Sequence, residues 1–272
     1  MERQANTEYV LSLSYGKDSI ACIEAIKRLN YPLDRIVHAE VWATDTLPAD
    51  LPQMVEFKKY ADAEIKKRWG LTVEHICAMR DGEKLTFEKI FYKKRTRGAS
   101  AGKIFGFPTH QCNWCNSYLK MNAINKAHSV KKGWKAVRYV GITADEKQRI
   151  QRHITKNIVL PLVDIGWTEQ ACLDWCKKNN LLSPIYQNAK RGGCWFCHNI
   201  TVGELRTLRS NYPDLWGLLL KWDLDSPYTF LSNHTTVHDF ELRFAAEDNG
   251  IIDPNNKKFR WSQVLKSKEE ES

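Results

Sequence analysis

The chain has 272 residues, 43% of them hydrophobic, which suffices for one large α/β domain or for one domain with a smaller appendage. No apolar run approaches the roughly 20 residues that span a bilayer, and the first residues contain no apolar signal segment. We therefore predict a cytoplasmic protein without a membrane partner. The net charge of +9 fits either a solvated basic surface or an anionic partner.

Hydrophobic periodicity predicts strands that alternate with helices. We expect strands over 9–13, 36–42, 71–76, 136–142 and 159–163, and helices over about 20–29, 54–69, 116–128 and 168–179. Thr168 is the expected N-cap of the last helix. This order predicts right-handed crossovers and a Rossmann-like parallel sheet with helices on both faces.

The pattern changes over 81–111, where cations alternate with aromatic residues, and again after about residue 190. The first stretch predicts a basic helix followed by a loop. Its part over 84–107 could follow a nucleic-acid backbone and stack bases, or could form a solvated lid. We predict a nucleotide-binding α/β domain over 1–190, which contains this basic insertion, and a mainly helical appendage over 191–272.

A polar loop follows the first expected strand and leads directly into a helix. It reads Ser14-Tyr15-Gly16-Lys17-Asp18-Ser19. A helix N-terminus at the carboxyl end of a strand presents unpaired N–H groups to an anion. Gly16 permits close approach of the backbone, the hydroxyls of Ser14 and Ser19 can donate to phosphate, Lys17 adds a charge, and Asp18 can hold Mg²⁺ or cap the helix. The sequence therefore predicts a phosphate-binding loop, although it fits neither a Walker A loop nor a dinucleotide fingerprint.

The hexapeptide resembles the PP-loop of the N-type ATP pyrophosphatases, usually written S-G-G-x-D-S. Further along, the segment over 141–149 resembles the family's G-x-R-x-x-E-x-x-R segment. The residues over 160–169 resemble its P-L-x-D-W-T junction, and the stretch over 179–186 loosely resembles another family segment. The similarity covers most of 8–198 and is greatest to the branch that contains the PAPS (3′-phosphoadenosine 5′-phosphosulfate) and APS (adenosine 5′-phosphosulfate) reductases.

The resemblance implies an adenine-nucleotide alpha-hydrolase-like fold and a set of site residues. It makes the loop residues, including Tyr15, nucleotide contacts, and it places Asp45 and Gly141 beside the nucleotide. Lys17, Asp18 and Arg149 become the candidate catalytic residues, with Arg149 directed to the anionic end of the substrate. The implied ligands are ATP, or PAPS or APS, together with Mg²⁺.

Four of the eight cysteines form two C-x-x-C pairs, Cys112 with Cys115 and Cys194 with Cys197. Two such pairs supply four thiolates, a number that suits tetrahedral Zn²⁺ and a [4Fe–4S] cluster equally. The 78 residues between Cys115 and Cys194 are too many for a zinc ribbon. The fold would therefore have to bring the pairs together and tie the appendage to the sheet domain. The resemblance favours the [4Fe–4S] cluster, with Zn²⁺ as the alternative.

No cysteine follows Cys197, whereas PAPS and APS reductases attack their substrate with a cysteine in a C-terminal motif. We therefore expect an adenylating enzyme that cleaves ATP to AMP and pyrophosphate and prepares an acceptor for sulfur insertion. The acceptor would be a nucleic acid, tRNA or DNA, and a sulfur-donor protein would be a further partner. The alternatives are a PAPS or APS reductase or a sulfurylase-like enzyme, and a non-enzymatic nucleotide-binding partner in a larger complex.

Overall fold

The computed structural model describes residues 1–109, 111–153, 157–187, 192–231, 235–256 and 259–262. Within them the chain divides into two units, one of residues 1–89 and 114–195 and the other of 90–113 and 196–272. The expected boundary lay at residue 190. The basic segment from residue 90 on groups with the C-terminal helices, whereas the sequence placed the whole segment inside the first domain.

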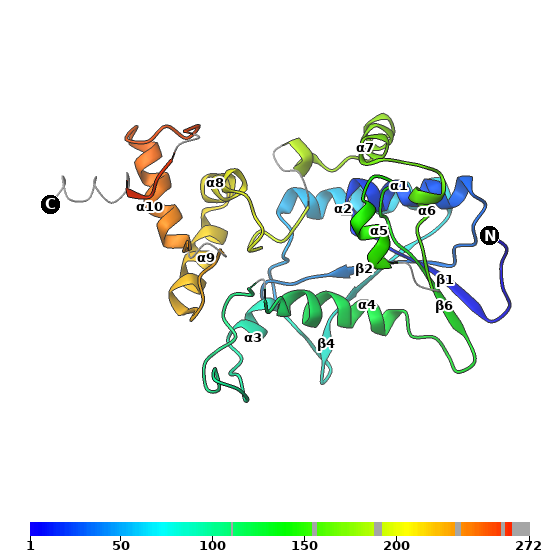
Figure 1. The fold of residues 1–272 in the computed structure, drawn as a ribbon, viewed down its shortest axis with the longest axis horizontal. Coiled ribbons are helices and arrows are strands. Elements are labelled where there is room, and N and C mark those ends of the chain that lie inside the picture. The colour runs from blue at the N-terminus through cyan, green and yellow to red at the C-terminus, as the bar shows by residue number, and fades with distance from the viewer. Residues whose placement is uncertain (110, 154–156, 188–191, 232–234, 257–258, 263–272) are drawn as a thin grey trace. The chain divides into compact units, whose positions relative to one another are not determined.

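The first unit contains a five-stranded sheet in the order β3-β2-β1-β6-β7, and all four strand pairings are parallel (Figure 1). The strands are β1 (Thr7–Ser12), β2 (Arg35–Glu40), β3 (Val73–Cys77), β6 (Lys135–Tyr139) and β7 (Ile158–Val159). Tyr9, Val10 and Leu11 of the central strand have no exposed surface, as expected for a strand that is covered on both faces. The prediction of a Rossmann-like parallel sheet is confirmed.

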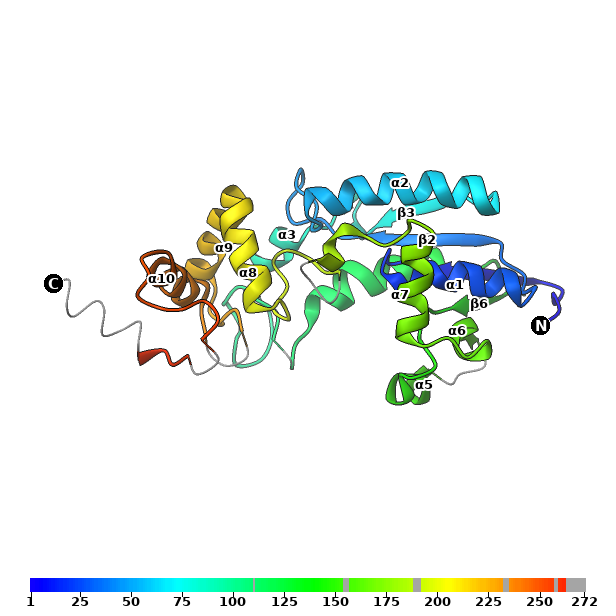
Figure 2. The same ribbon diagram turned by 90° about the horizontal axis from the view of Figure 1, so that it is seen from above.

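Helices cover both faces of this sheet. They are α1 (Lys17–Arg28), α2 (Pro52–Trp69), the π-helix η1 (Asn116–Met121) with its continuation α4 (Asn122–Ala127), α5 (Lys147–His153), α6 (Pro161–Asp164), α7 (Glu169–Lys178) and the 3₁₀ turn η2 (Pro184–Gln187). α1, α2 and α7 lie on one side and α4 on the other (Figure 1). Figure 2 shows α7 crossing α1, against which it packs. Thr168 caps α7 as predicted, because its side chain accepts a hydrogen bond from the Ala171 N–H.

Two local predictions were wrong. The strand expected over 159–163 ends at Val159, because Pro161 has no N–H for a ladder and instead begins α6. The basic helix expected after residue 81 is replaced by a hairpin of β4 (Met79–Arg80) and β5 (Glu83–Lys84), followed by the short helix α3 (Phe87–Phe91). Asp81 and Gly82 at the hairpin turn both have positive φ, which favours the turn over a helix.

The second unit contains α8 (Val202–Asn211), α9 (Pro213–Asp225) and α10 (Val237–Asp248). Capping boxes begin α8 at Thr201 and α10 at Thr236. Phe91 and Phe107 of the basic segment pack edge to face at 5.3 Å, and Phe107 meets Phe230 at 5.0 Å. This packing explains why the segment belongs to the second unit.

Candidate functional site

A pocket of about 330 Å³ opens beyond the carboxyl ends of β1 and β6. The strand order reverses between these two strands. β2 and β3 continue the sheet on one side of β1, whereas β6 and β7 continue it on the other side. Ligands of open α/β sheets bind at this kind of position. Seven site residues that the sequence predicted line the pocket: Ser14, Gly16, Asp18, Ser19, Gly141, Arg149 and the candidate metal ligand Cys194. All of them belong to the first unit.

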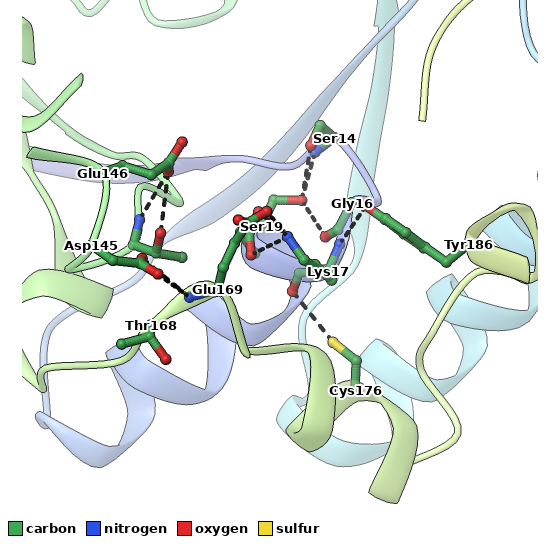
Figure 3. Close-up of polar contacts among 12 residues, drawn as sticks. Ser14, Gly16, Lys17, Ser19, Asp145, Glu146, Thr168, Glu169, Cys176 and Tyr186 are labelled. Atoms are coloured by element: carbon green, nitrogen blue, oxygen red, sulfur yellow. Dashed lines mark hydrogen bonds and ion pairs between the residues drawn. The ribbon is translucent and has the colours of Figure 1, made fainter. Parts of the chain in front are cut away.

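The loop after β1 is held in shape by its two serines (Figure 3). Ser19 Oγ donates to the Gly16 carbonyl at 3.0 Å and accepts from the Ser14 N–H at 3.1 Å, while the two serine hydroxyls lie 3.0 Å apart. Gly16 precedes α1 in extended conformation and has no side chain to cap the helix, whose first N–H, that of Lys17, donates to the Tyr186 hydroxyl at 3.2 Å. The loop is thus preformed, with hydroxyls and helix N–H groups at the pocket wall.

Tyr15 does not line the pocket but anchors the loop from behind. Its φ is +56°, in the left-handed region that side chains rarely adopt, and its ring is fully buried. Its hydroxyl donates to Asp62 and lies 3.1 Å from His75 Nε2. Burial, reinforced by the bond to Asp62, raises the pKa of Tyr15, so the hydroxyl stays protonated as a donor.

Lys17, predicted as a phosphate contact, is directed elsewhere. Its Nζ lies 2.6 Å from Glu169 and 3.1 Å from the Asp18 carboxylate (Figure 3), and it is not among the described residues that line the pocket. Burial lowers the pKa of the Lys17 ammonium, but the bond to Glu169 and the charge of Asp18 outweigh burial, so the pKa rises. Lys17 therefore joins the loop to the N-terminus of α7 as a charged tie.

Asp18 is the carboxylate that the loop presents to the pocket. Burial raises its pKa, and the charge of Lys17 offsets this effect only in part. A further cation in the pocket would favour the ionised form. A carboxylate oxygen beside phosphate groups is the ligand set that Mg²⁺ prefers, so Asp18 fits the implied metal.

Gly141 brings the end of β6 close to the first turn of α1. A Cβ at this position would lie 2.9 Å from Ser19 Cα and 3.0 Å from the Asp18 carbonyl group. Only glycine permits this approach without displacement of the loop. The glycine that the sequence placed beside the nucleotide is therefore required by the packing of the loop itself.

The other lining residues, which the sequence did not identify as functional, include Tyr186, Lys120 and His38. The Tyr186 hydroxyl accepts from the Lys17 N–H at 3.2 Å. Tyr186 falls within the stretch over 179–186 that loosely resembles the family, and this resemblance is the signal in the sequence that could have identified it. Lys120 of η1 faces the pocket together with Arg149 of α5, although nothing in its sequence context marked it. Arg149 itself forms an ion pair with Glu146.

The third is His38, a buried polar residue of β2. It belongs to a buried chain of contacts in which Lys58 Nζ lies 2.7 Å from His38 Nε2 and 2.5 Å from Asp50, itself a lining residue. Since Lys58 only donates, His38 carries its proton on Nδ1, which donates to the Leu13 carbonyl at 2.8 Å. Burial and the charge of Lys58 hold the pKa of His38 well below its ordinary value, so the ring is neutral.

Asp45 is not brought to this pocket among the described lining residues. Its carboxylate forms an ion pair with Lys89 at 2.9 Å, and its side chain is 64% exposed. The turn at 44–46 lacks the glycine of the family pattern, which was the one sequence sign of this difference.

Three of the five aromatic residues of the basic segment are buried, and Tyr92 and Phe105 are partly buried. Phe87, Phe91 and Phe107 have no exposed surface, and Arg95 stacks on Phe105 at 4.5 Å. These phenylalanines belong to the core and are not a platform for stacking bases. Lys89 is neutralised by Asp45, so the cations also contribute less than their number suggests.

None of the cysteines forms a disulfide. Cys115 and Cys194 belong to the first unit, and Cys112 and Cys197 to the second. Across the described residues, no group of three or more His, Cys, Asp or Glu side chains is arranged to hold a metal ion. The four-cysteine site therefore stays a prediction.

Comparison of the chain with protein-family models, with curated proteins and with solved structures finds no match. The fold and the pocket define an α/β protein with a Rossmann-like sheet and a preformed loop at the point where its strand order reverses. No helix in the described part of the chain is long and apolar enough to cross a membrane.

Proposed function

We propose that this protein binds ATP in the pocket beyond β1 and β6 and cleaves it between the α- and β-phosphates. An oxygen of an acceptor attacks the α-phosphorus, the bond to the bridging oxygen of the β-phosphate breaks, and pyrophosphate leaves. The acceptor becomes adenylated, and a sulfur nucleophile then displaces AMP from it. The proposed activity is that of an ATP pyrophosphatase of the PP-loop kind, which serves nucleic-acid thiolation or a related sulfur insertion.

The observation that carries this proposal is the position of the serine loop. The hydroxyls of Ser14 and Ser19 and the first turn of α1, whose N-cap Gly16 has no capping side chain, lie at the pocket wall, at the ligand-binding end of the sheet. The tie between Lys17 and Glu169 leaves the backbone N–H groups and hydroxyls as the phosphate donors. Such fixed donors stabilise the charge that develops on the phosphate oxygens without reorganisation.

The charged residues at the pocket wall receive separate tasks. Asp18 would hold Mg²⁺, which when bound neutralises phosphate charge and makes pyrophosphate a better leaving group. Lys120 and Arg149 supply positive charge from two different elements, η1 and α5. They would orient the phosphate chain and stabilise the departing pyrophosphate.

The cysteine pairs support the sulfur side of the proposal through the family resemblance alone. Cys194 lines the pocket, so one of the four candidate ligands lies beside the proposed site of chemistry. A [4Fe–4S] cluster, or Zn²⁺, would be held by all four thiolates, and no step is assigned to it.

Two other functions remain as competing proposals. A reductase or sulfurylase-like enzyme would bind PAPS or APS in the same pocket, but the chain has no cysteine after Cys197 to attack the sulfonucleotide. A non-enzymatic partner would bind the nucleotide without cleaving it.

The proposal is tested by incubating the purified protein with Mg²⁺ and ATP and measuring AMP and pyrophosphate, with and without tRNA or duplex DNA. We expect pyrophosphate release, reduced about 100-fold by the double change Ser14→Ala and Ser19→Ala and by Asp18→Asn. Asp81→Asn, at a carboxylate that is 92% exposed and outside the pocket, is the matched control.

The same preparation is incubated with PAPS and a dithiol as the two-electron reductant, and sulfite is measured. Sulfite without pyrophosphate from ATP would replace the proposal with the reductase alternative. Nucleotide binding with neither product would favour the non-enzymatic partner.

A further inference from the structure

A second hollow lies in the first unit, where the C-termini of α1, α2 and α7 come together. It measures about 480 Å³, and its lining includes Lys27 and Arg28 from α1, Arg68 and Trp69 from α2, and Lys178 from α7. The nucleotide loop lies at the opposite end of α1, a helix of 12 residues and therefore about 18 Å long. The hollow is thus a separate feature from the proposed ATP pocket.

The helices that end at the hollow carry more positive charge than is needed to balance the partial negative charges of their C-termini. Seven basic residues occupy the last turns of these helices: Lys27, Arg28, Lys66, Lys67, Arg68, Lys177 and Lys178. A helix C-terminus carries about half a negative charge, so three of them account for about 1.5 charges. Glu24 and Glu64, which pair with Arg28 and Arg68, account for two more. An excess of about three positive charges therefore remains.

Part of this surface is rigid and part is available to a ligand. Arg68 is fixed by Glu64 at 2.6 Å and by the Asn179 carbonyl at 2.9 Å, so it joins α2 to the end of α7. Arg28 is paired with Glu24 and stacks on Trp167 at 5.0 Å, which orients its guanidinium. Lys27 and Lys178 are exposed and make no ion pair among the described residues.

Indole rings form the floor between these cations. Trp69 and Trp175 line the hollow with their ring centroids 6.3 Å apart, and Trp167 continues the row at 6.2 Å from Trp175. Cations that are spaced over a hydrophobic floor fit a ligand with regularly spaced anionic groups between flat rings or sugars. The phosphate backbone of a nucleic acid has this chemistry.

We propose that the hollow at the C-termini of α1, α2 and α7 is a docking surface for the phosphate backbone of a nucleic acid. It replaces the segment over 84–107, in which Phe87, Phe91 and Phe107 are buried, as the place where such a partner is held. Binding at this surface does not depend on the proposed ATP chemistry. Only the further step, that the bound nucleic acid carries the acceptor, rests on the proposed function.

The test compares two doubly substituted proteins that lose the same charge. Lys27→Gln with Lys178→Gln changes the hollow, whereas Lys59→Gln with Lys221→Gln changes exposed lysines on α2 and α9 that do not line it. Binding of a fluorescent 20-base-pair DNA duplex and of tRNA is measured by anisotropy between 50 and 200 mM salt. ATP binding is measured in parallel by calorimetry.

We expect the hollow variant to bind nucleic acid about tenfold more weakly, with the slope of log K against log salt reduced by about two, because each lost phosphate contact lowers the slope by about 0.9. The control pair should bind like the unchanged protein, and ATP affinity should be equal in all three.

Equal weakening in the two variants, or no nucleic-acid binding by the unchanged protein, would overturn the proposal. Displacement of the nucleic acid by polyglutamate at equal charge concentration would also overturn it, in favour of an acidic protein partner. If the unchanged protein binds nucleic acid but does not cleave ATP, that result counts against the proposed function and leaves the docking surface unaffected.

Discussion

Tyr15 in the loop after β1 donates its hydroxyl hydrogen to the Asp62 carboxylate in α2. The contact continues through His75, whose Nε2 lies 2.8 Å from Asp62 and whose Nδ1 lies 2.9 Å from Glu40. The loop is thereby joined to α2, β3 and β2. A residue in the left-handed region costs about 1–3 kcal/mol, which these neighbours must offset.

Removal of this hydroxyl should loosen the loop without removing a phosphate donor. We predict that Tyr15→Phe lowers the free energy of unfolding by about 1–2 kcal/mol, because it leaves a partly buried carboxylate with one partner fewer. ATP affinity should fall about tenfold, since a mobile loop must be ordered on binding. Urea unfolding and calorimetry measure the two effects. Tyr60→Phe, on a tyrosine that is 44% exposed, should change neither, and unchanged ATP affinity in Tyr15→Phe would show that the anchor is irrelevant to binding.

The glycine after β6 offers a test of the packing behind the loop. Gly141→Ala places a methyl group 2.9 Å from Ser19 Cα, so either β6 or the first turn of α1 must move. We predict a loss of about 1–3 kcal/mol in stability and a larger proportional loss of ATP affinity. Gly203→Ala, in α8 with nothing within 4 Å of the added methyl, should stabilise by up to about 1 kcal/mol. ATP binding by Gly141→Ala at the unchanged level would contradict the assigned site.

The parallel sheet and the place of the polar loop between β1 and α1 could be predicted because local signals agreed. Three consecutive features agreed: the apolar run at 9–13 predicted a strand, the polar residues a loop, and the stripe of Ile20, Ile23 and Ile26 a helix. All three isoleucines are buried. Short elements were less predictable. Two residues of β7 give too little periodicity to separate a strand from the turn of α6 that follows.

The candidate site was only partly predictable, because side-chain direction depends on partners distant in sequence. Lys17 has the residue type of a phosphate ligand, but Glu169, 152 positions away, holds its ammonium. Lys120 reaches the pocket only through the placement of η1 against the sheet. The phenylalanines of the basic segment had the pattern of a stacking surface, yet their burial depends on contacts with the C-terminal unit, such as Phe107 with Phe230.

The tie between Lys17 and Glu169 makes a prediction that separates a phosphate ligand from a structural residue. Glu169 is 58% exposed, so Glu169→Gln should cost less than about 1 kcal/mol of stability. It would release Lys17 to turn toward bound phosphate, and we predict that ATP binds several-fold more tightly. Glu56→Gln, on an exposed glutamate of α2, is the control. Weaker ATP binding by Glu169→Gln would instead make Glu169 a supporting residue of the site.

His128, which follows α4, should make the protein sensitive to acid. The ring is 3% exposed, and its Nδ1 has no partner among the described residues. Burial first, and then the charges of Arg138 and Arg35, lower the pKa of His128 to about 4. In the unfolded chain the same ring titrates near about 6.5. Between these two values the unfolded state binds more protons, so the free energy of unfolding falls as the pH drops from 6.5 toward 4.

We expect this one residue to account for on the order of 1–2 kcal/mol of that loss between pH 7 and 5, because this range covers only part of the interval between the two pKa values. Replacement by an uncharged residue removes the titration. Urea midpoints at pH 7, 6 and 5 should therefore fall less steeply for His128→Gln than for the unchanged protein, while His153→Gln in α5 should keep the original slope. Parallel pH profiles for His128→Gln and the unchanged protein would mean that other groups cause the acid sensitivity.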